Sequence, residues 1–201
     1  MRLLPNNKHM AKLKRITKLS DLFNFRRVGN YYASFISGGA QTTQGLASAN
    51  SLRAFPFYIP KLSRFDRVAI RVTTAGTGTT PRVRLGIYKD NGNVYPDSLV
   101  LDAGELDVST TGVKELTINT TLPEGLYWIA LVGQDTASLA VAATPNTDHY
   151  PIVGYESDLS GTPLHAWAHV QTYGSLPASY PTSSPTGWTL HIPLIALRKA
   201  S

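Results

Sequence analysis

The chain has 201 residues, of which 42% are hydrophobic, enough for one substantial core and too apolar for a disordered chain. It contains no cysteine, which excludes a disulfide framework and a cysteine-ligated metal site. The net charge of +6 is uneven, because residues 1–27 hold eight Lys and Arg against the single acid Asp21. The remaining residues hold 11 Lys and Arg and 12 acids, so the high isoelectric point does not indicate a nucleic-acid-binding body.

Targeting signals are not evident in the sequence. No stretch approaches the length of a transmembrane span, and no apolar segment follows the basic N-terminus as a secretory signal requires. A mitochondrial transit peptide stays open as an alternative, since the N-terminal residues are basic and acid-poor. However, Ser20 is the only serine before residue 34, and such peptides are serine-rich. Met10 is a second candidate start.

The first predicted element is a basic amphipathic helix over residues 10–25. Apolar residues recur at steps of three and four, namely Leu13, Ile16, Leu19 (or Ser20) and Phe23. Basic residues fill the other side, namely Lys12, Lys14, Arg15 and Lys18. A helix of about four turns is marginal alone in water, so we expect it to order against the body, a neighbouring copy or another protein. With Arg26 and Arg27, residues 1–30 form a predicted anchoring arm, and residues 31–201 form one β-sandwich domain.

Short strands follow the arm. They are predicted at residues 31–37, 52–59, 66–74, 83–88, 113–118, 126–132, 139–143, 164–173 and 188–197. Most alternate between apolar and polar residues, whereas residues 126–132 are almost continuously apolar and suit a strand buried on both faces. Pro56 either lies at a sheet edge or splits its strand. Residues 38–45 and 174–187 are predicted loops. About nine to eleven strands at this spacing predict an all-β fold, a jelly-roll-type antiparallel β-sandwich.

Four phrases in the centre of the chain carry a family resemblance: residues 84–88 (RLGIY), 99–104 (LVLDAG), 111–115 (TGVKE) and 122–130 (LPEGLYWIA). They resemble a β-sandwich module of tailed-bacteriophage virion proteins, found in head-decoration proteins, head fibres and tail fibres. The resemblance implies a place in the virion, capsid or tail proteins as partners, and self-association, most simply as a trimer. Similar sandwiches occur in carbohydrate-binding domains, so the fold alone does not decide the function.

A second candidate site is aromatic, because residues 149–191 are rich in Tyr and Trp. Sugars dock on aromatic rings with polar neighbours, since their C–H groups cover the ring while their hydroxyls reach outward. The candidate glycan-binding residues are Tyr155, His165, Trp167, His169, Tyr173 and Tyr180. The alternative is that Trp167 and Trp188 pack in the core or between subunits, and Trp128 is expected in the core.

Metal and catalytic signals are weak. His165 and His169 lie about 13 Å apart if they share a strand, too far to hold one ion easily. The acids Asp90 and Asp97 flank a turn that could cup calcium, but Asp-Asn-Gly is ordinary hairpin chemistry. The chain lacks a nucleophile elbow, a phosphate-binding loop and a dinucleotide fingerprint. We therefore expect no metal, no cofactor and no enzymatic activity.

The leading hypothesis is a non-enzymatic structural protein of a phage virion, displayed on the particle and anchored by the arm. The alternative is a glycan-binding receptor module that recognises host surface polysaccharide. The basic arm could meet nucleic acid, an anionic membrane or an acidic protein surface. It has few aromatic residues and offers phosphate contacts without base readout, so a nucleic-acid partner is not favoured, and no membrane insertion is expected.

Overall fold

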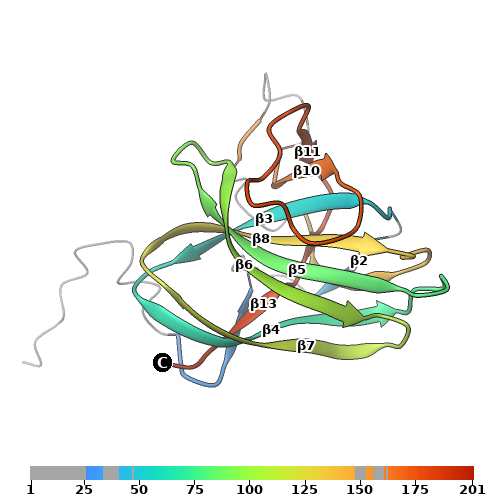
Figure 1. Cartoon of the computed structure of the whole chain (residues 1–201), viewed down its shortest axis with the longest axis horizontal. Helices are drawn as coiled ribbons and strands as arrows, with labels where there is room; N and C mark the ends of the chain where they lie inside the picture. The colour runs from blue at the N-terminus through green and yellow to red at the C-terminus, as the bar shows by residue number, and fades with distance from the viewer. Residues whose placement is uncertain (1–25, 34–40, 47, 148–152, 156–160, 162) are drawn as a thin grey trace, which may run out of the picture.

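The computed structural model describes residues 26–33, 41–46, 48–147, 153–155, 161 and 163–201. This part of the chain contains thirteen strands and no helix. The strands form two antiparallel sheets (Figure 1), and side chains from both sheets share one core. The fold is therefore all-β with antiparallel sheets, as predicted, and is consistent with a β-sandwich. The helix predicted over residues 10–25 lies outside the described residues.

The first sheet has six strands in the order β11-β10-β3-β8-β5-β6. Their bounds are β3 Ser51–Ile59, β5 Arg82–Asp90, β6 Pro96–Asp107, β8 Gly125–Gln134, β10 Ala166–Val170 and β11 Thr186–Trp188. The resemblance phrases at residues 84–88 and 99–104 lie on β5 and β6, which pair directly with each other.

The second sheet has seven strands, along the path β1-β13-β4-β9-β12, with β2 paired to β9 and β7 paired to β4. Their bounds are β1 Tyr31–Ala33, β2 Thr42–Gly45, β4 Ser63–Thr74, β7 Gly112–Leu122, β9 Ala140–Thr144, β12 Ile192–Pro193 and β13 Ala196–Lys199. The long strand β4 organises this sheet, since β7 pairs along one side while β13 and β9 share the other.

Alternation along each strand places one set of side chains between the sheets, as the sequence predicts. The shared core takes, among others, Phe55, Phe57 and Ile59 from β3, Val68, Ile70 and Val72 from β4, and Val83, Leu85 and Ile87 from β5. On β7 the core-facing residues are Leu116 and Ile118, whereas Val113, Glu115 and Thr117 are exposed.

The strand β8 is buried on both faces, as its continuous apolar run predicts. Tyr127, Ile129 and Leu131 enter the core between the sheets, while Trp128 and Ala130 enter a separate cluster on the outer face. The backbone of β8 is also paired on both sides, with β3 and with β5. β8 is therefore a central strand that is enclosed on both faces and both edges.

The predicted single strand at residues 188–197 is wrong. Trp188 ends β11 in the six-stranded sheet, whereas Ile192 pairs with β9 in the seven-stranded sheet, so the chain crosses from one sheet to the other. Leu190 lies on this crossing and is 52% exposed, although the alternation placed it with Trp188. Three short strands, β11, β12 and β13, replace the predicted one.

Two other boundaries differ from the prediction. Residues 42–45 form β2 rather than part of a loop, because they pair with β9 along its free edge. The strand predicted at 164–173 is shorter, because β10 pairs with β3 only over residues 167–170. Pro56 lies in the unbroken strand β3, beyond the last residue that pairs with β10, so it occupies a free edge as predicted.

The last residues of the predicted arm lie against the body. The Arg26 guanidinium donates a hydrogen bond to the Tyr58 carbonyl at 3.0 Å and lies over the Tyr32 and Phe57 rings, 5.2 and 4.8 Å from their centres. Burial lowers the pKa of Arg26. The Arg26 carbonyl accepts a hydrogen bond from the Lys199 ammonium at 3.1 Å. Arg26 therefore fixes the start of the described chain to the open edge of the sandwich.

This contact predicts a difference between two neighbouring arginines. We expect Arg26→Ala to lower the free energy of unfolding by roughly 1–3 kcal/mol, because it removes a charged hydrogen bond and two ring contacts. The matched control Arg27→Ala removes an exposed side chain and should change it by less than about 0.5 kcal/mol. Urea unfolding of both variants measures the difference, and equal effects would contradict the assignment.

Candidate functional site

The outer face of the six-stranded sheet is apolar and covered. The sheet residues buried there are Leu52, Ala54, Tyr88, Trp128, Ala130 and Val132. A two-layer sandwich normally turns polar residues outward on such a face. Here residues 171–181, which we name the covering segment, follow β10 and lie across the sheet as a third layer; in Figure 1 this segment is the orange-red loop in front of the sheet.

Backbone hydrogen bonds hold the covering segment at both ends. At its start, Gln171 N–H donates to the Asn50 carbonyl at 2.9 Å. At its end, Leu99 N–H donates to the Ala178 carbonyl at 2.9 Å, and Tyr180 N–H donates to the Asp97 carbonyl at 2.7 Å. The segment therefore spans from the start of β3 to the edge strand β6.

Four tyrosine and tryptophan side chains fill the space under the covering segment. The Tyr180 ring stands edge-on to Tyr88 and Tyr95, with ring centres 5.4 and 5.8 Å apart, and Tyr95 lies 5.1 Å from Trp167. Their polar atoms donate to backbone carbonyls: Tyr88 to Pro177 at 2.9 Å, Tyr95 to Pro181 at 2.6 Å, Trp167 to Val94 at 2.9 Å and Tyr180 to Leu52 at 3.1 Å. Because these polar atoms already donate to the backbone, the cluster stabilises the fold and does not offer these donors to a ligand.

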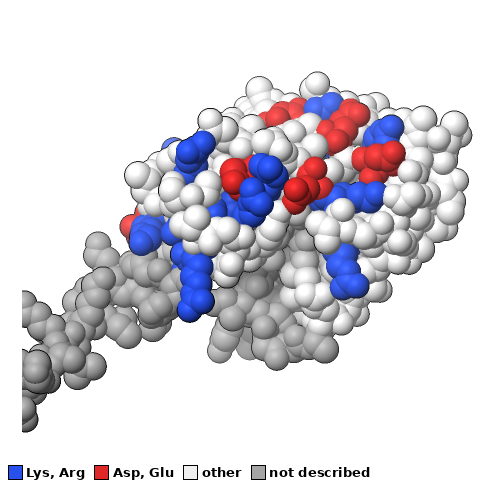
Figure 2. Space-filling model, turned by 90° about the horizontal axis from the view of Figure 1, so that it is seen from below, with Lys and Arg blue, Asp and Glu red and all other residues white. Residues whose placement is uncertain are grey.

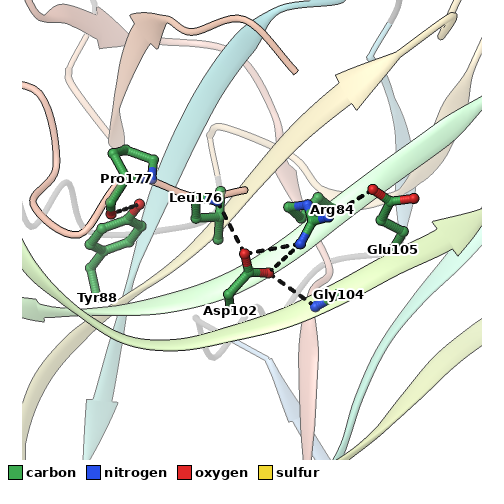
Figure 3. Close-up of polar contacts among 7 residues, drawn as sticks. All are labelled: Arg84, Tyr88, Asp102, Gly104, Glu105, Leu176 and Pro177. Atoms are coloured by element: carbon green, nitrogen blue, oxygen red, sulfur yellow. Dashed lines mark hydrogen bonds and ion pairs between the residues drawn. The ribbon is translucent and has the colours of Figure 1, made fainter. Parts of the chain in front are cut away.

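A charged cluster joins the middle of the covering segment to β5 and β6 (Figure 3). Arg84 donates to both oxygens of Asp102 at 2.9 Å and to Glu105 at 2.7 Å. The Asp102 carboxylate also accepts hydrogen bonds from the backbone N–H groups of Gly104 and Leu176, both at 3.1 Å. One partly buried carboxylate therefore connects β5, β6 and the covering segment.

Leu176 packs over a glycine of β5. A Cβ atom on Gly86 would lie 2.1 Å from the Leu176 side chain and 2.7 Å from the Leu101 carbonyl oxygen, so only glycine fits there. Gly86, Arg84, Asp102 and Leu176 are not recognisable as a group from the sequence. Arg84 and Asp102 carry opposite charges, but only the register of β5 against β6 shows that they face each other.

The predicted glycan-binding residues do not form an open aromatic surface. Tyr155 is 42% exposed, whereas Tyr180 and His165 are buried, so the latter two cannot present a ring to a sugar. Trp167, His169 and Tyr173 are half-buried. Burial, and then the nearby Glu105 carboxylate, raise the pKa of Tyr173 to about 12. Tyr173 and Tyr180 belong to the covering segment itself and pack, with Trp167, against the outer face of the six-stranded sheet.

Most of the predicted anchoring residues cannot be placed. Lys12, Leu13, Lys14, Arg15, Ile16, Lys18 and Phe23 lie outside the described residues. Of the remaining two, Arg26 is fixed to the body and Arg27 is exposed.

In the described part of the chain, no group of three or more His, Asp or Glu side chains is placed to hold one metal ion. The Asp90 carboxylate accepts hydrogen bonds from Trp128 Nε1 at 2.8 Å and from Gly92 N–H at 2.7 Å, which is turn chemistry. The charge of Arg84 is neutralised by Asp102 and Glu105. These ion pairs, with the hydrogen bond from the Leu176 amide to Asp102, hold β5, β6 and the covering segment together.

No protein-family model matches the chain, and no curated protein matches it significantly. Within the described residues, no helix has the length and hydropathy needed to cross a membrane.

The close packing of Leu176 on Gly86 predicts that a larger residue at position 86 displaces the covering segment. We expect Gly86→Ala to cost roughly 1–3 kcal/mol, because the added methyl group overlaps Leu176 and β6. Hydrogen exchange at the Leu99 and Tyr180 amides should accelerate with it. The control Gly45→Ala has nothing within 4 Å of the new atom and should leave both amides protected. Equal exchange in the two variants would contradict the packing account.

The charged cluster predicts unequal roles for two aspartates of β6. Asp102→Asn should lower the free energy of unfolding by roughly 1.5–3 kcal/mol and expose the Leu176 amide to exchange, since it removes one of the two charges that Arg84 faces. Asp107→Asn affects a more exposed pair with Arg82, at 3.0 Å, and should lower the free energy of unfolding less than Asp102→Asn does. Thermal or urea unfolding ranks the variants, and the reverse ranking would contradict the assignment.

Proposed function

We propose that the protein is a non-enzymatic structural protein of a tailed-phage virion, displayed on the particle as a capsid decoration protein or a head or tail fibre. The jelly-roll-type body faces outward, and the N-terminal arm attaches it to capsid or tail proteins. The observation that carries this proposal is the segregation of charge. Residues 1–27 hold eight Lys and Arg against one acid, whereas the rest of the chain is nearly neutral.

The described body supports this division because four of its seven arginines are paired with acids. Arg67, Arg82, Arg84 and Arg198 each form an ion pair with an acid of the body. Figure 2 shows basic and acidic side chains side by side over one face of the molecule. A surface of mixed sign attracts a charged partner weakly, so the basic arm is the part suited to an acidic protein surface.

The resemblance phrases add a second support, because two of the four occupy strands at the centre of the six-stranded sheet. Residues 84–88 and 122–130 fall on β5 and on β8 with the turn before it, and the two strands pair with each other. We propose that copies of the body associate with each other, most simply as a trimer. Binding of host polysaccharide is the weaker alternative, since Trp167, Tyr173 and Tyr180 pack in the cluster between the covering segment and the sheet.

The experiment compares two truncations in particles assembled with the altered chain. Deletion of residues 1–25 keeps Arg26 and its contacts, so the body should stay folded while incorporation falls at least about tenfold. Deletion of residues 1–9 removes two basic residues, keeps the predicted helix, and should leave incorporation near normal. Density-gradient sedimentation followed by quantification of the protein measures both. Normal incorporation of the longer deletion would overturn the anchoring role.

A further inference from the structure

An apolar hollow of about 220 Å³ lies on the outer face of the seven-stranded sheet. It forms where two strands diverge along β4, because β13 pairs with β4 up to Ala69 whereas β9 begins to pair at Val72. Alanines Ala69, Ala142 and Ala196 line it, together with larger side chains of Tyr31, Val113 and Leu194. The hollow stays open because these three alanine side chains are too short to fill it.

The hollow leaves apolar surface in contact with water. Val113 is 65% exposed and Tyr31 is 40% exposed, although both border a concave apolar surface. Apolar surface kept from water stabilises by roughly 25 cal/mol per Å², and contiguous apolar patches on soluble proteins mark binding sites. A matching apolar occupant would therefore gain from covering it.

We propose that the hollow binds the N-terminal segment of the same chain, residues 10–25, through its apolar stripe. That stripe comprises Leu13, Ile16, Leu19 and Phe23. A helix of this length needs an apolar partner to be stable, and the hollow is an apolar surface of the body with large exposed side chains at its border. Its basic side would remain outward.

The position of Arg26 brings the segment within reach. Arg26 packs on Phe57 at the edge of the core, whereas the hollow lies on the outer face of the same sheet as Lys199, which binds the Arg26 carbonyl. Ala196 in the hollow lies three residues along β13 from Lys199, roughly 10 Å at about 3.3 Å per residue. A helix over residues 10–25 would be about 24 Å long at about 1.5 Å per residue, which is enough to pass around the edge strand β1 and reach the hollow.

The turn that follows Arg26 agrees with this reach. Asn30 N–H donates to the Arg27 carbonyl at 3.3 Å, so the chain reverses direction between Arg26 and β1. Tyr31, the first residue of β1, itself lines the hollow. The upstream chain therefore starts beside the edge strand that borders the site.

This docking adds detail to the proposed function. It rests on that function in one respect only, namely that a partner on the particle binds the outward basic side of the segment. Seating the apolar stripe on the body leaves Lys12, Lys14, Arg15 and Lys18 free. The arm would then be a fixed basic surface of the body rather than a free tether. A preformed surface loses less conformational entropy on binding than a mobile one.

The absence of cysteine allows a direct test in the full-length chain. Ile16→Cys combined with Val113→Cys places one thiol on the apolar stripe and one at the hollow. The matched control combines Lys14→Cys with Val113→Cys, which has nearly the same tether length but a thiol on the basic side. After mild oxidation of dilute purified protein, we expect the first pair to form an intramolecular disulfide at least tenfold faster than the control, measured by non-reducing gel and intact mass.

Every other outcome overturns the proposal. Equal rates for the two pairs would show a freely moving arm, and a disulfide between two chains would make a second copy the occupant. No disulfide in either pair would leave the hollow to another partner. As a second variant, Ala142→Leu should fill the hollow and slow the first pair at least tenfold, with folding checked by urea unfolding. Because no particle is present, failure here is distinct from failure of the anchoring role, which particle incorporation measures.

Discussion

The strand β8 is apolar on both faces, and the rest of the structure follows from the need to bury it twice. One face packs into the core shared by the two sheets, through Tyr127, Ile129 and Leu131. The other face carries Trp128, Ala130 and Val132, which would meet water in a plain two-layer sandwich. The covering segment supplies the missing third layer, and the cluster of Arg84 and Asp102 fixes its middle. Burying this face removes a large apolar surface from water, and it also removes the aromatic residues from possible ligands.

The distribution of charge separates two tasks along the chain. In the body, each of four arginines faces a carboxylate on a neighbouring strand, so the body has little charge left to attract a partner. In the arm, six Lys and Arg residues precede Arg26 and only Asp21 opposes them. Arg26 stands between the two regions, because it belongs to the basic arm by sequence but packs on Phe57 at the edge of the core. The proposed attachment through the arm and the folding of the body can therefore change independently.

Alternation of side chains was enough to predict the sandwich, because a period of two is visible in β4, β5 and β7 without any knowledge of their partners. The covering segment was predicted only as a loop. Its hydrogen bonds use backbone carbonyls such as those of Pro177 and Ala178, which any sequence could supply. The ion pair of Arg84 with Asp102 joins residues 18 apart and depends on shifts in register between β5 and β6. The alternation from Trp188 to Leu194 misled for another reason, since the chain changes sheets between them.

We propose that the arm attaches the protein while the body carries its own fold and assembly. Light scattering at matched concentrations gives the mass in solution of the full-length chain and of the chain lacking residues 1–25. We expect the same number of copies for both, with the truncated body as cooperatively folded as the full-length chain. Loss of assembly on truncation would contradict this proposal, because the N-terminal segment would then be the device that joins the copies.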